Sequence, residues 1–281
     1  MRKLLLSSAT VLLAAVAGFT TGCDKLKSRD QLNQGVNSFK NAKYGDAVEH
    51  FKQAIALDPD NPNAQLYLAT AYMSQWIPGA ESPDNIRMSE LAVEGFKKVL
   101  EKNPSDPTAL ASLASISYQQ ASSLPPDKKL EKLDEAASWN KKLIEADPKN
   151  KEAFYYLGVI SWAKWYPQWI NARLNAHMKP EDPGPLKDKK AKAELATQYN
   201  AIIDDGISNL NKALDIDKEY EDAMVYLSLL IREKADLLDD AAEYKKQIEI
   251  ADNWQQKALD TKKLKASRAA DKSTGITTDA K

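Results

Sequence analysis

A small residue recurs at a fixed distance from a helix-ending proline, and this register constrains the fold more than any other feature of the sequence. Helical stretches end at Pro59, Pro104 and Pro148. An alanine lies twelve residues before each proline, and another small residue lies ten residues after it. Small side chains allow two helices to approach closely where they cross, and a proline beyond a helix prevents its continuation. The register therefore predicts consecutive helical hairpins with a small residue on each helix.

The same frame continues through most of the chain, with Lys218 and Lys263 in the proline position of the last two units. It yields five pairs of small residues: Gly35 and Ala47, Ala69 and Ala92, Ala114 and Ala136, Gly158 and Gly206, and Ser228 and Ala251. The first pair is separated by 12 residues and the later pairs by 22 to 48, so the later hairpins contain insertions. Residues 77–83 and 124–127 have the composition of turns. We expect these turns to thicken one edge of a stack of hairpins.

The composition favours helices but offers little for catalysis. The chain has 39 lysine and arginine residues against 40 aspartate and glutamate residues, so it has no overall basic character for binding nucleic acid. It has only 10 glycines and no glycine-rich phosphate-binding motif. The single cysteine excludes a disulfide framework, and the two histidines, His50 and His177, lack metal-ligand spacing. We therefore expect no enzyme activity, no catalytic residues, no cofactor, no metal ion and no nucleic acid partner.

The N-terminus has the features of a secretory signal peptide. Two basic residues precede an uncharged, mostly apolar run over residues 4–19. This run is shorter than the roughly 20 apolar residues that a membrane span needs, and it fits the apolar part of a signal peptide. We therefore exclude it from the folded part of the chain.

The only cysteine, Cys23, follows this run in the sequence Thr20-Thr21-Gly22-Cys23. This segment resembles the lipobox of bacterial lipoproteins, although Thr20 stands where leucine is usual. The resemblance implies a signal peptide over residues 1–22, fatty acylation of Cys23 and a short lipidated tether over residues 23–29. Cleavage after Ala17 is the alternative, and it would leave Cys23 as a free thiol.

The hairpin register resembles the tetratricopeptide repeat, most closely over residues 28–61. Six residues of this segment stand at family positions: Gly35, Tyr44, Ala47, Phe51, Ala54 and Pro59. The resemblance covers residues 28–266 and implies an all-α, right-handed superhelical solenoid of about five antiparallel helical hairpins with lengthened turns. The implied repeats are 28–61, 62–106, 107–150, 151–220 and 221–265.

The fourth repeat contains the largest insertion, over about residues 166–194. We expect its first helix to run from about residue 151 to 165 and to be interrupted near Pro167, because proline disrupts a helix interior. A short segment over 168–178 and a loop over 179–185 should precede a second helix that begins near Leu186. The C-terminal tail, residues 267–281, is predicted to be disordered and solvated, with contact to anionic lipid or glycan as the alternative.

In the family, the first helix of each hairpin lines the groove that binds a partner. Carried over to this sequence, the groove positions are Phe39, Thr70, Met73, Tyr118, Tyr155 and Trp162. An apolar and aromatic face of this kind suits an amphipathic helix or an extended peptide. The Lys and Asn residues with which chaperone-binding members hold a C-terminal carboxylate are absent. The open alternative is that neighbouring helices or the insertion cover this face.

A second aromatic group, Trp165, Tyr166 and Trp169, follows Trp162 at helical spacing. It is a possible stacking platform for a sugar ring, or else it fixes the insertion to the solenoid.

We therefore expect a membrane-anchored scaffold or adaptor of the bacterial cell envelope, facing the periplasm or the exterior. It would contact the membrane through lipidated Cys23 and envelope proteins through the groove. The alternative is a lipoprotein that binds cell-wall glycan through the tryptophan group. The sequence does not specify an oligomeric state.

Overall fold

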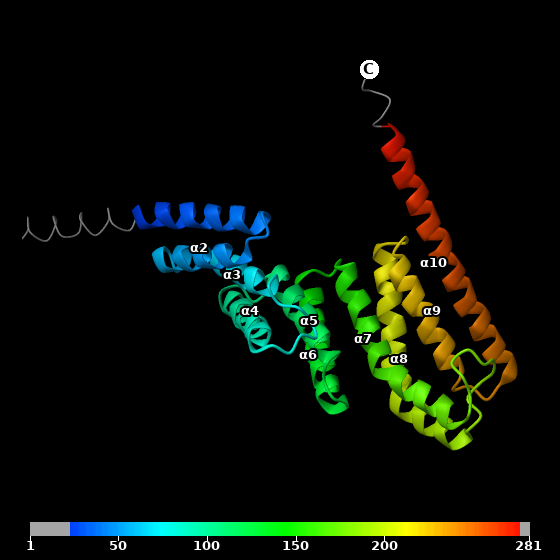
Figure 1. The fold of residues 1–281 in the computed structure, drawn as a ribbon. Coiled ribbons are helices and arrows are strands. Elements are labelled where there is room, and N and C mark those ends of the chain that lie inside the picture. Colours follow the sequence, from blue (N-terminus) through cyan, green and yellow to red (C-terminus); the bar gives the residue numbers. More distant parts are fainter. Residues whose placement is uncertain (1–22, 276–281) are drawn as a thin grey trace, which may run out of the picture. The chain divides into compact units, whose positions relative to one another are not determined.

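The computed structural model describes residues 23–275, and within that range the chain consists of helices joined by turns (Figure 1). The predicted signal peptide and residues 276–281 lie outside the described residues. The chain divides into two compact units, unit 1 (Met1–Ser123) and unit 2 (Leu124–Lys281). The boundary falls in the turn that the sequence predicts at residues 124–127.

Unit 1 contains two helical hairpins and one further helix. Its helices are residues 23–40, α2 (Tyr44–Leu57), α3 (Ala64–Met73), α4 (Pro83–Lys102) and α5 (Pro107–Ala121). Prolines begin α4 and α5, where the missing N–H would have no helical partner. The side chains of Ser82 and Asp106 cap these helices, each accepting a hydrogen bond from the backbone N–H three residues ahead.

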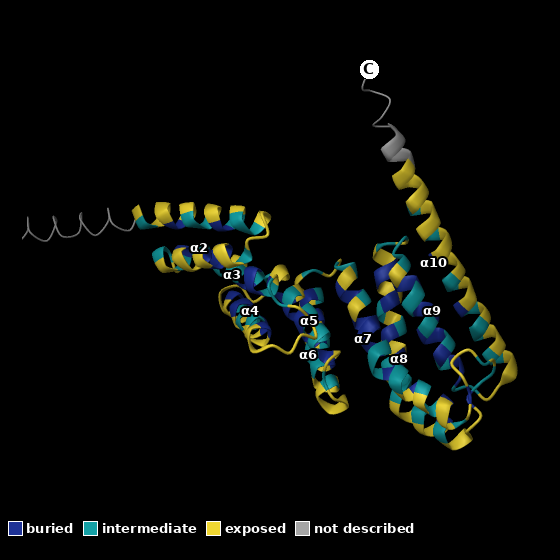
Figure 2. Ribbon diagram, viewed as in Figure 1, coloured by how far each residue is buried: buried dark blue, intermediate teal, exposed yellow. Residues whose placement is uncertain are grey.

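Unit 2 contains one helix followed by two longer hairpins. Its helices are α6 (Pro126–Ala146), α7 (Lys151–Asn175), α8 (Lys189–Ile216), α9 (Glu221–Ala235) and α10 (Ala241–Gly275). Within this unit, α7 packs against α6, α8 and α9, and α10 packs against α9. Buried residues are concentrated on α7, α8 and α9, whereas one side of α10 is exposed through residue 270 (Figure 2).

The register of small residues marks the places where helices cross. A Cβ atom on Gly35 would lie 2.5 Å from Phe51, and one on Gly158 would lie 2.4 Å from Leu210. At Gly206 a Cβ atom would lie 2.6 Å from Ser161. The remaining members of the five pairs are at most 4% exposed: Ala47, Ala69, Ala92, Ala114, Ala136, Ser228 and Ala251. The prediction of an all-α fold of helical hairpins, with small residues at the crossings, is confirmed.

The insertions lengthen both the turns and the second helices. The second helix of the first hairpin, α2, has 14 residues, whereas α4, α6, α8 and α10 have 20, 21, 28 and 35. In the turn between α3 and α4, one side chain makes three hydrogen bonds to the backbone. Asn85 accepts a hydrogen bond from the N–H of Ile77 and donates to the carbonyl oxygens of Ile77 and Ala80, at 2.6, 2.8 and 2.8 Å. A single buried amide therefore holds this turn.

The expected interruption of the helix at Pro167 is wrong, because α7 continues through it to Asn175. Proline removes one helical hydrogen bond and crowds the preceding turn. On either side of it, however, Trp165 and Trp169 are buried. The indole Nε1 of Trp169 also donates a hydrogen bond to Asp236 Oδ2 of α9 at 2.8 Å. Tertiary packing of these two rings therefore outweighs the local cost of the proline. The second helix of this hairpin begins at Lys189, three residues later than expected.

The two ends of the solenoid are more helical than the sequence suggests. Residues 24–29, expected to form a tether, belong to the helix over residues 23–40. Ser28 is fully buried there, and its hydroxyl donates to the Ala54 carbonyl at 2.8 Å. At 1.5 Å per residue, the six tether residues span about 9 Å instead of the roughly 20 Å of an extended chain. At the other end, α10 continues past residue 267 to Gly275, where an irregular tail was expected.

Candidate functional site

The groove positions of unit 1 are half-buried residues that are spaced along three helices. Phe39, Thr70, Met73 and Tyr118 all retain partial exposure. The ring of Phe39 packs against Tyr44 of its own hairpin, with centroids 5.2 Å apart. The hydroxyl of Thr70 donates to the Leu66 carbonyl one turn earlier, at 2.8 Å. These residues therefore form a mixed face rather than a continuous aromatic one.

In unit 2 the groove positions are part of a continuous run of aromatic rings, which we call the aromatic ridge. On α7 it consists of Tyr155, Tyr156, Trp162 and Tyr166. Tyr220, which caps the start of α9, and Tyr226, within α9, complete it. Tyr155 lies 5.2 Å from Tyr156, 5.0 Å from Tyr220 and 5.7 Å from Tyr226, measured between ring centroids. Trp162 continues the run, 5.5 Å from Tyr226 and stacked on Tyr166 at 4.7 Å.

The ridge is neither buried in the core nor fully solvated. Five of its rings are half-buried, and Tyr156 is 39% exposed. Neighbouring rings at these distances stabilise one another, so the ridge is ordered before any partner arrives. The partial burial of Tyr155, Tyr220 and Tyr226 raises the pKa of their hydroxyls, and the negative charge of Asp222 raises it further. These hydroxyls therefore stay neutral at physiological pH and act as hydrogen-bond donors.

A buried polar network lies behind the ridge. Trp162 Nε1 donates to Glu233 Oε1 at 3.0 Å. About two and three turns further along α7, Trp169 Nε1 and the guanidinium of Arg173 both donate to Asp236 Oδ2, three residues after Glu233. The side chains of Arg173 and Asp236 are 2% and 5% exposed, so their ion pair is shielded from solvent. This network was not expected from the sequence, because Glu233 stands between Arg232 and Lys234 in a charged stretch and Asp236 follows the end of α9.

The same arginine fixes the insertion loop, residues 176–188. Arg173 donates to the carbonyl oxygens of Lys179 at 3.0 Å, Asp182 at 2.5 Å and Gly184 at 3.4 Å. From the other side, Tyr244 Oη accepts a hydrogen bond from the Gly184 N–H at 2.9 Å. The loop is therefore bound to the turn between α9 and α10, although it contains no helix or strand of its own.

The network also changes the acidity of its carboxyl groups. Burial raises the pKa of Glu233 to about 8, the hydrogen bond from Trp162 opposes this rise, and the nearby charge of Asp236 adds to it. Burial likewise raises the pKa of Asp236, against the opposing effects of Trp169 and Arg173. At neutral pH, Glu233 therefore holds a proton for most of the time and contributes no full negative charge behind the ridge.

The expected stacking platform is not available to a sugar. Trp165 and Trp169 are buried, and only Tyr166 of that group is half-exposed. Their contacts match the alternative interpretation, in which the tryptophans fix the insertion to the solenoid. Of the histidines, His50 shares a hydrogen bond with Gln31 at 2.8 Å, and His177 is exposed in the insertion loop. No cluster of three or more potential metal ligands occurs among residues 23–275.

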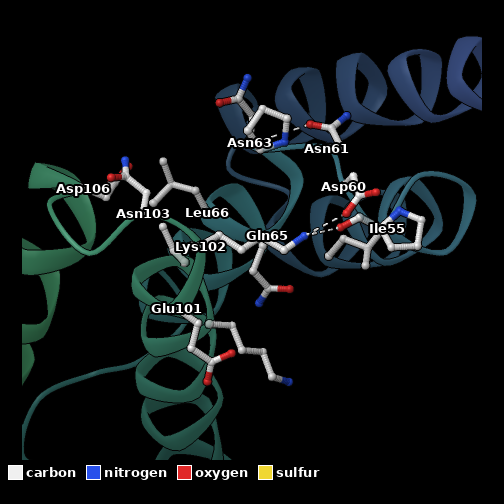
Figure 3. A pocket seen from close by; sticks show the side chains of 14 residues that line it. Ile55, Asp60, Asn61, Asn63, Gln65, Leu66, Glu101, Lys102, Asn103 and Asp106 are labelled. Atoms are coloured by element: carbon white, nitrogen blue, oxygen red, sulfur yellow. Dashed lines mark hydrogen bonds and ion pairs between the residues drawn. The ribbon is translucent and has the colours of Figure 1, made fainter.

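Unit 1 has a pocket that the sequence did not indicate. It lies where α2, α3 and α4 meet the two inter-hairpin turns, and it encloses about 570 Å³ (Figure 3). Its apolar wall includes Ile55, Leu66 and Val99, and charges of both signs surround the mouth. Lys102 crosses one side, where Nζ donates to the Pro59 carbonyl at 2.8 Å and approaches Asp60 Oδ1 at 3.4 Å. This balanced lining does not select a particular ligand charge.

Cys23 is exposed at the first described position of the N-terminal helix. Its acylation stays a prediction, as do the partner-binding roles of the groove residues. None of the described helices combines the length and the apolar character needed to cross a membrane.

A family model described as TPR repeat matches residues 38–75, which contain all of α2 and α3. These helices carry the small residues and the turn at Pro59 that define the register. Residues 38–75 form a tetratricopeptide repeat. The resemblance found in the sequence is thus confirmed, and Ala47 and Ala69 are small residues of the register within the matched segment.

Known proteins with the same repeat resemble the chain at low sequence identity. Hsp70-Hsp90 organizing protein 2 of Arabidopsis thaliana is 26% identical over 178 residues, which are 63% of this chain. The chain spans about a quarter of the length of that relative, 26%. The crystal structure of MamA protein covers 86% of this chain and 94% of its own, at 16% identity and a TM-score of 0.50. A MamA RS-1 double mutant covers 86% and 97%, at 17% identity and a TM-score of 0.52. These structures show the shared fold.

Proposed function

We propose that this tetratricopeptide-repeat protein is a scaffold or adaptor of the bacterial cell envelope, anchored to a membrane through Cys23. It binds a segment of a partner protein on the aromatic ridge, and we propose no catalytic role. The observation that carries the proposal is the ridge itself: six adjoining rings on the first helices of two repeats, all with exposed surface. Tetratricopeptide repeats mediate protein–protein interactions, and the ridge lies on the helices that line their groove.

Ordered aromatic side chains are well suited to this role. Tyrosine and tryptophan bring large contact areas and polar atoms while losing little conformational entropy on binding. The network of Arg173, Asp236 and Glu233 supports the ridge from behind, because it fixes the indole of Trp162 by a hydrogen bond. A partner segment would therefore meet a surface that requires little rearrangement.

Site-specific crosslinking in the native cell tests the binding surface. A photo-crosslinking amino acid replaces Tyr156, which is 39% exposed on the ridge, or Leu130 of α6, which is 44% exposed and lies outside it. We expect a discrete crosslinked protein from position 156 alone, and its loss when Trp162→Ala is added. The proposal is wrong if neither position yields a product, or if both yield the same products.

The anchor requires a separate test. With Cys23→Ser, the protein should move from the membrane fraction to the soluble fraction and should lose incorporation of labelled palmitate. Ser38→Ala, an equally small change in the same N-terminal helix, is the matched control. If Cys23→Ser fractionates like the parent protein and the parent protein takes up no label, the proposed anchor is wrong. The proposed binding surface does not depend on that result.

A further inference from the structure

The charges at one end of the aromatic ridge are unbalanced. We call this region the tyrosine end; it comprises Tyr155, Tyr156, Tyr220 and Tyr226. Three carboxylates surround these rings and act on them electrostatically: Glu152, Asp217 and Asp222. A cation also contacts this group: Lys151 Nζ lies 5.1 Å from the centroid of the Tyr220 ring. The tyrosine end therefore carries net negative charge.

The internal cation does not neutralise this surface. Lys151 is held by Asp217 at 2.6 Å and lies 3.9 Å from Glu152, so its charge is already shared between two carboxylates. The other carboxylates at the start of α9 have their own partners, since Glu219 pairs with Arg268 and Glu221 with Lys265. Asp222, in contrast, is exposed and has no ion pair within the described part of the chain. One carboxylate beside the tyrosines is thus left uncompensated.

The rings themselves are suited to a positive charge. The face of a tyrosine ring attracts a lysine or arginine side chain. Lys151 above Tyr220 demonstrates such a contact within this protein. On the same two helices, Glu152 lies one turn before Tyr156 on α7 and the exposed Asp222 lies one turn before the half-buried Tyr226 on α9, so carboxylates and ring surface are adjacent at this end.

We infer that the tyrosine end binds a lysine or arginine side chain of the partner, so that the segment bound on the ridge is basic. This inference rests on the proposed function and specifies its partner. The ridge continues from the tyrosine end to Trp162 and Tyr166, and these rings offer apolar contacts to the residues that flank the bound cation. That continuation favours a peptide segment over an isolated cationic group such as a choline headgroup.

Three synthetic peptides provide the probe. Each contains three tandem copies of Gly-Leu-Xaa-Ser, where Xaa is lysine, glutamine or glutamate, and carries a fluorescent label. Anisotropy titrations against the purified protein should give at least tenfold tighter binding for the lysine peptide than for the glutamate peptide, with glutamine between them. The preference should decrease as salt is added, because the contacts are partly exposed.

Removal of the uncompensated carboxylate is the decisive variant. Asp222→Asn should weaken binding of the lysine peptide about three- to fivefold and leave the glutamine peptide nearly unchanged. Asp205→Asn, at an exposed aspartate of α8, is the matched control and should change neither. Equal binding of the three peptides, no detectable binding of the lysine peptide, or equal effects of the two variants overturns the inference.

Two further results separate this inference from the proposed function. If position 156 crosslinks to a partner segment that is acidic or uncharged, the inference fails and the scaffold function stands. If vesicles of phosphatidylcholine bind in a manner that depends on Asp222 and the lysine peptide does not, a lipid replaces the peptide as ligand. A basic partner segment at position 156, lost with Asp222→Asn, supports both proposals.

Discussion

The two units contain the same repeat but stabilise their turns by different means. In unit 1 the buried polar residues are uncharged: Ser28, Asn85, Ser89 and Ser117. Unit 2 also buries four charged residues: Arg173, Lys192, Glu233 and Asp236. Buried charge is costly unless it is paired and hydrogen-bonded. The difference therefore calls for a structural reason, and the insertions supply it.

The reason is the amount of irregular backbone that each unit must satisfy. A single amide, that of Asn85, provides three hydrogen bonds to the turn between α3 and α4. The insertion loop of unit 2 is longer, and three of its carbonyl oxygens accept from one guanidinium, that of Arg173. A guanidinium has five N–H donors and needs a counterion when it is buried, which Asp236 provides. The comparison teaches that the length of the turn determines whether a neutral or a charged side chain can hold it.

The largest effect is predicted for a substitution that removes the charged side chain holding the insertion loop. Arg173→Met should reduce the free energy of unfolding of unit 2 by about 3–5 kcal/mol, because it leaves Asp236 buried without its partner and frees the loop carbonyls. Calorimetry gives the stability, and hydrogen exchange shows whether the loss is confined to unit 2. Arg87→Met, at an exposed residue of α4, is the matched control. An equal loss for both variants would contradict the comparison.

The second prediction concerns what the units share, which is the crossing of helices at small residues. Gly158→Ala and Gly35→Ala should each destabilise their own unit by about 1–3 kcal/mol, since the new methyl group would overlap Leu210 or Phe51. Gly45→Ala, where no atom lies within 4 Å of the new Cβ, should be neutral or stabilising by up to about 1 kcal/mol. Protection of amides in each hairpin measures these changes. If only unit 2 responded, the crossings would not be equivalent.

The third prediction concerns how the stability of unit 2 depends on pH through Glu233. The pKa of Glu233 is about 8 in the folded chain, against 4.5 for an ordinary glutamate. At pH values between 4.5 and 8, the folded state therefore keeps a proton that the unfolded state releases. The stability of unit 2 should therefore decrease as the pH rises from about 4.5 to 8. Glu233→Gln retains an acceptor for Trp162 without this proton, so its advantage over the parent should grow steadily as the pH rises through that range.

Denaturant unfolding at several pH values measures this difference. Glu90→Gln, at an exposed residue of α4, is the control in unit 1. A constant difference between Glu233→Gln and the parent across the range would show that Glu233 does not titrate with an altered pKa.

Sequence alone was sufficient for the repeat because its determinants are local. Gly158 and Gly206 are 48 residues apart, yet each occupies a helix crossing that is marked by its distance from a helix end. The ridge was predicted in part, since Tyr155 and Trp162 followed from the register. Tyr220 and Tyr226 were missed because the groove positions of the family do not include them, and only their contacts with Tyr155 place them on the same surface.

The errors came from interactions between distant segments. The sequence around Pro167 favours a break, and the helix survives because Trp169 is bonded to Asp236, 67 residues away. Residues 24–29 are rich in charge and suggested a tether, but the hydroxyl of Ser28 binds the Ala54 carbonyl and extends the helix. In both cases tertiary contacts that have no local sequence signature accompany the helical conformation.

The ion pair between Arg173 and Asp236 has a consequence for kinetics as well, because it joins residues 63 positions apart. Contacts within α9 and α10 are much closer in sequence, such as that of Ser228 with Ala251, 23 positions away. Distant contacts carry a larger entropy cost and tend to form after local ones. We therefore expect the insertion to dock late, so that loss of Arg173 accelerates unfolding and hardly changes the folding rate. The insertion would then determine how long unit 2 remains folded rather than how quickly it folds.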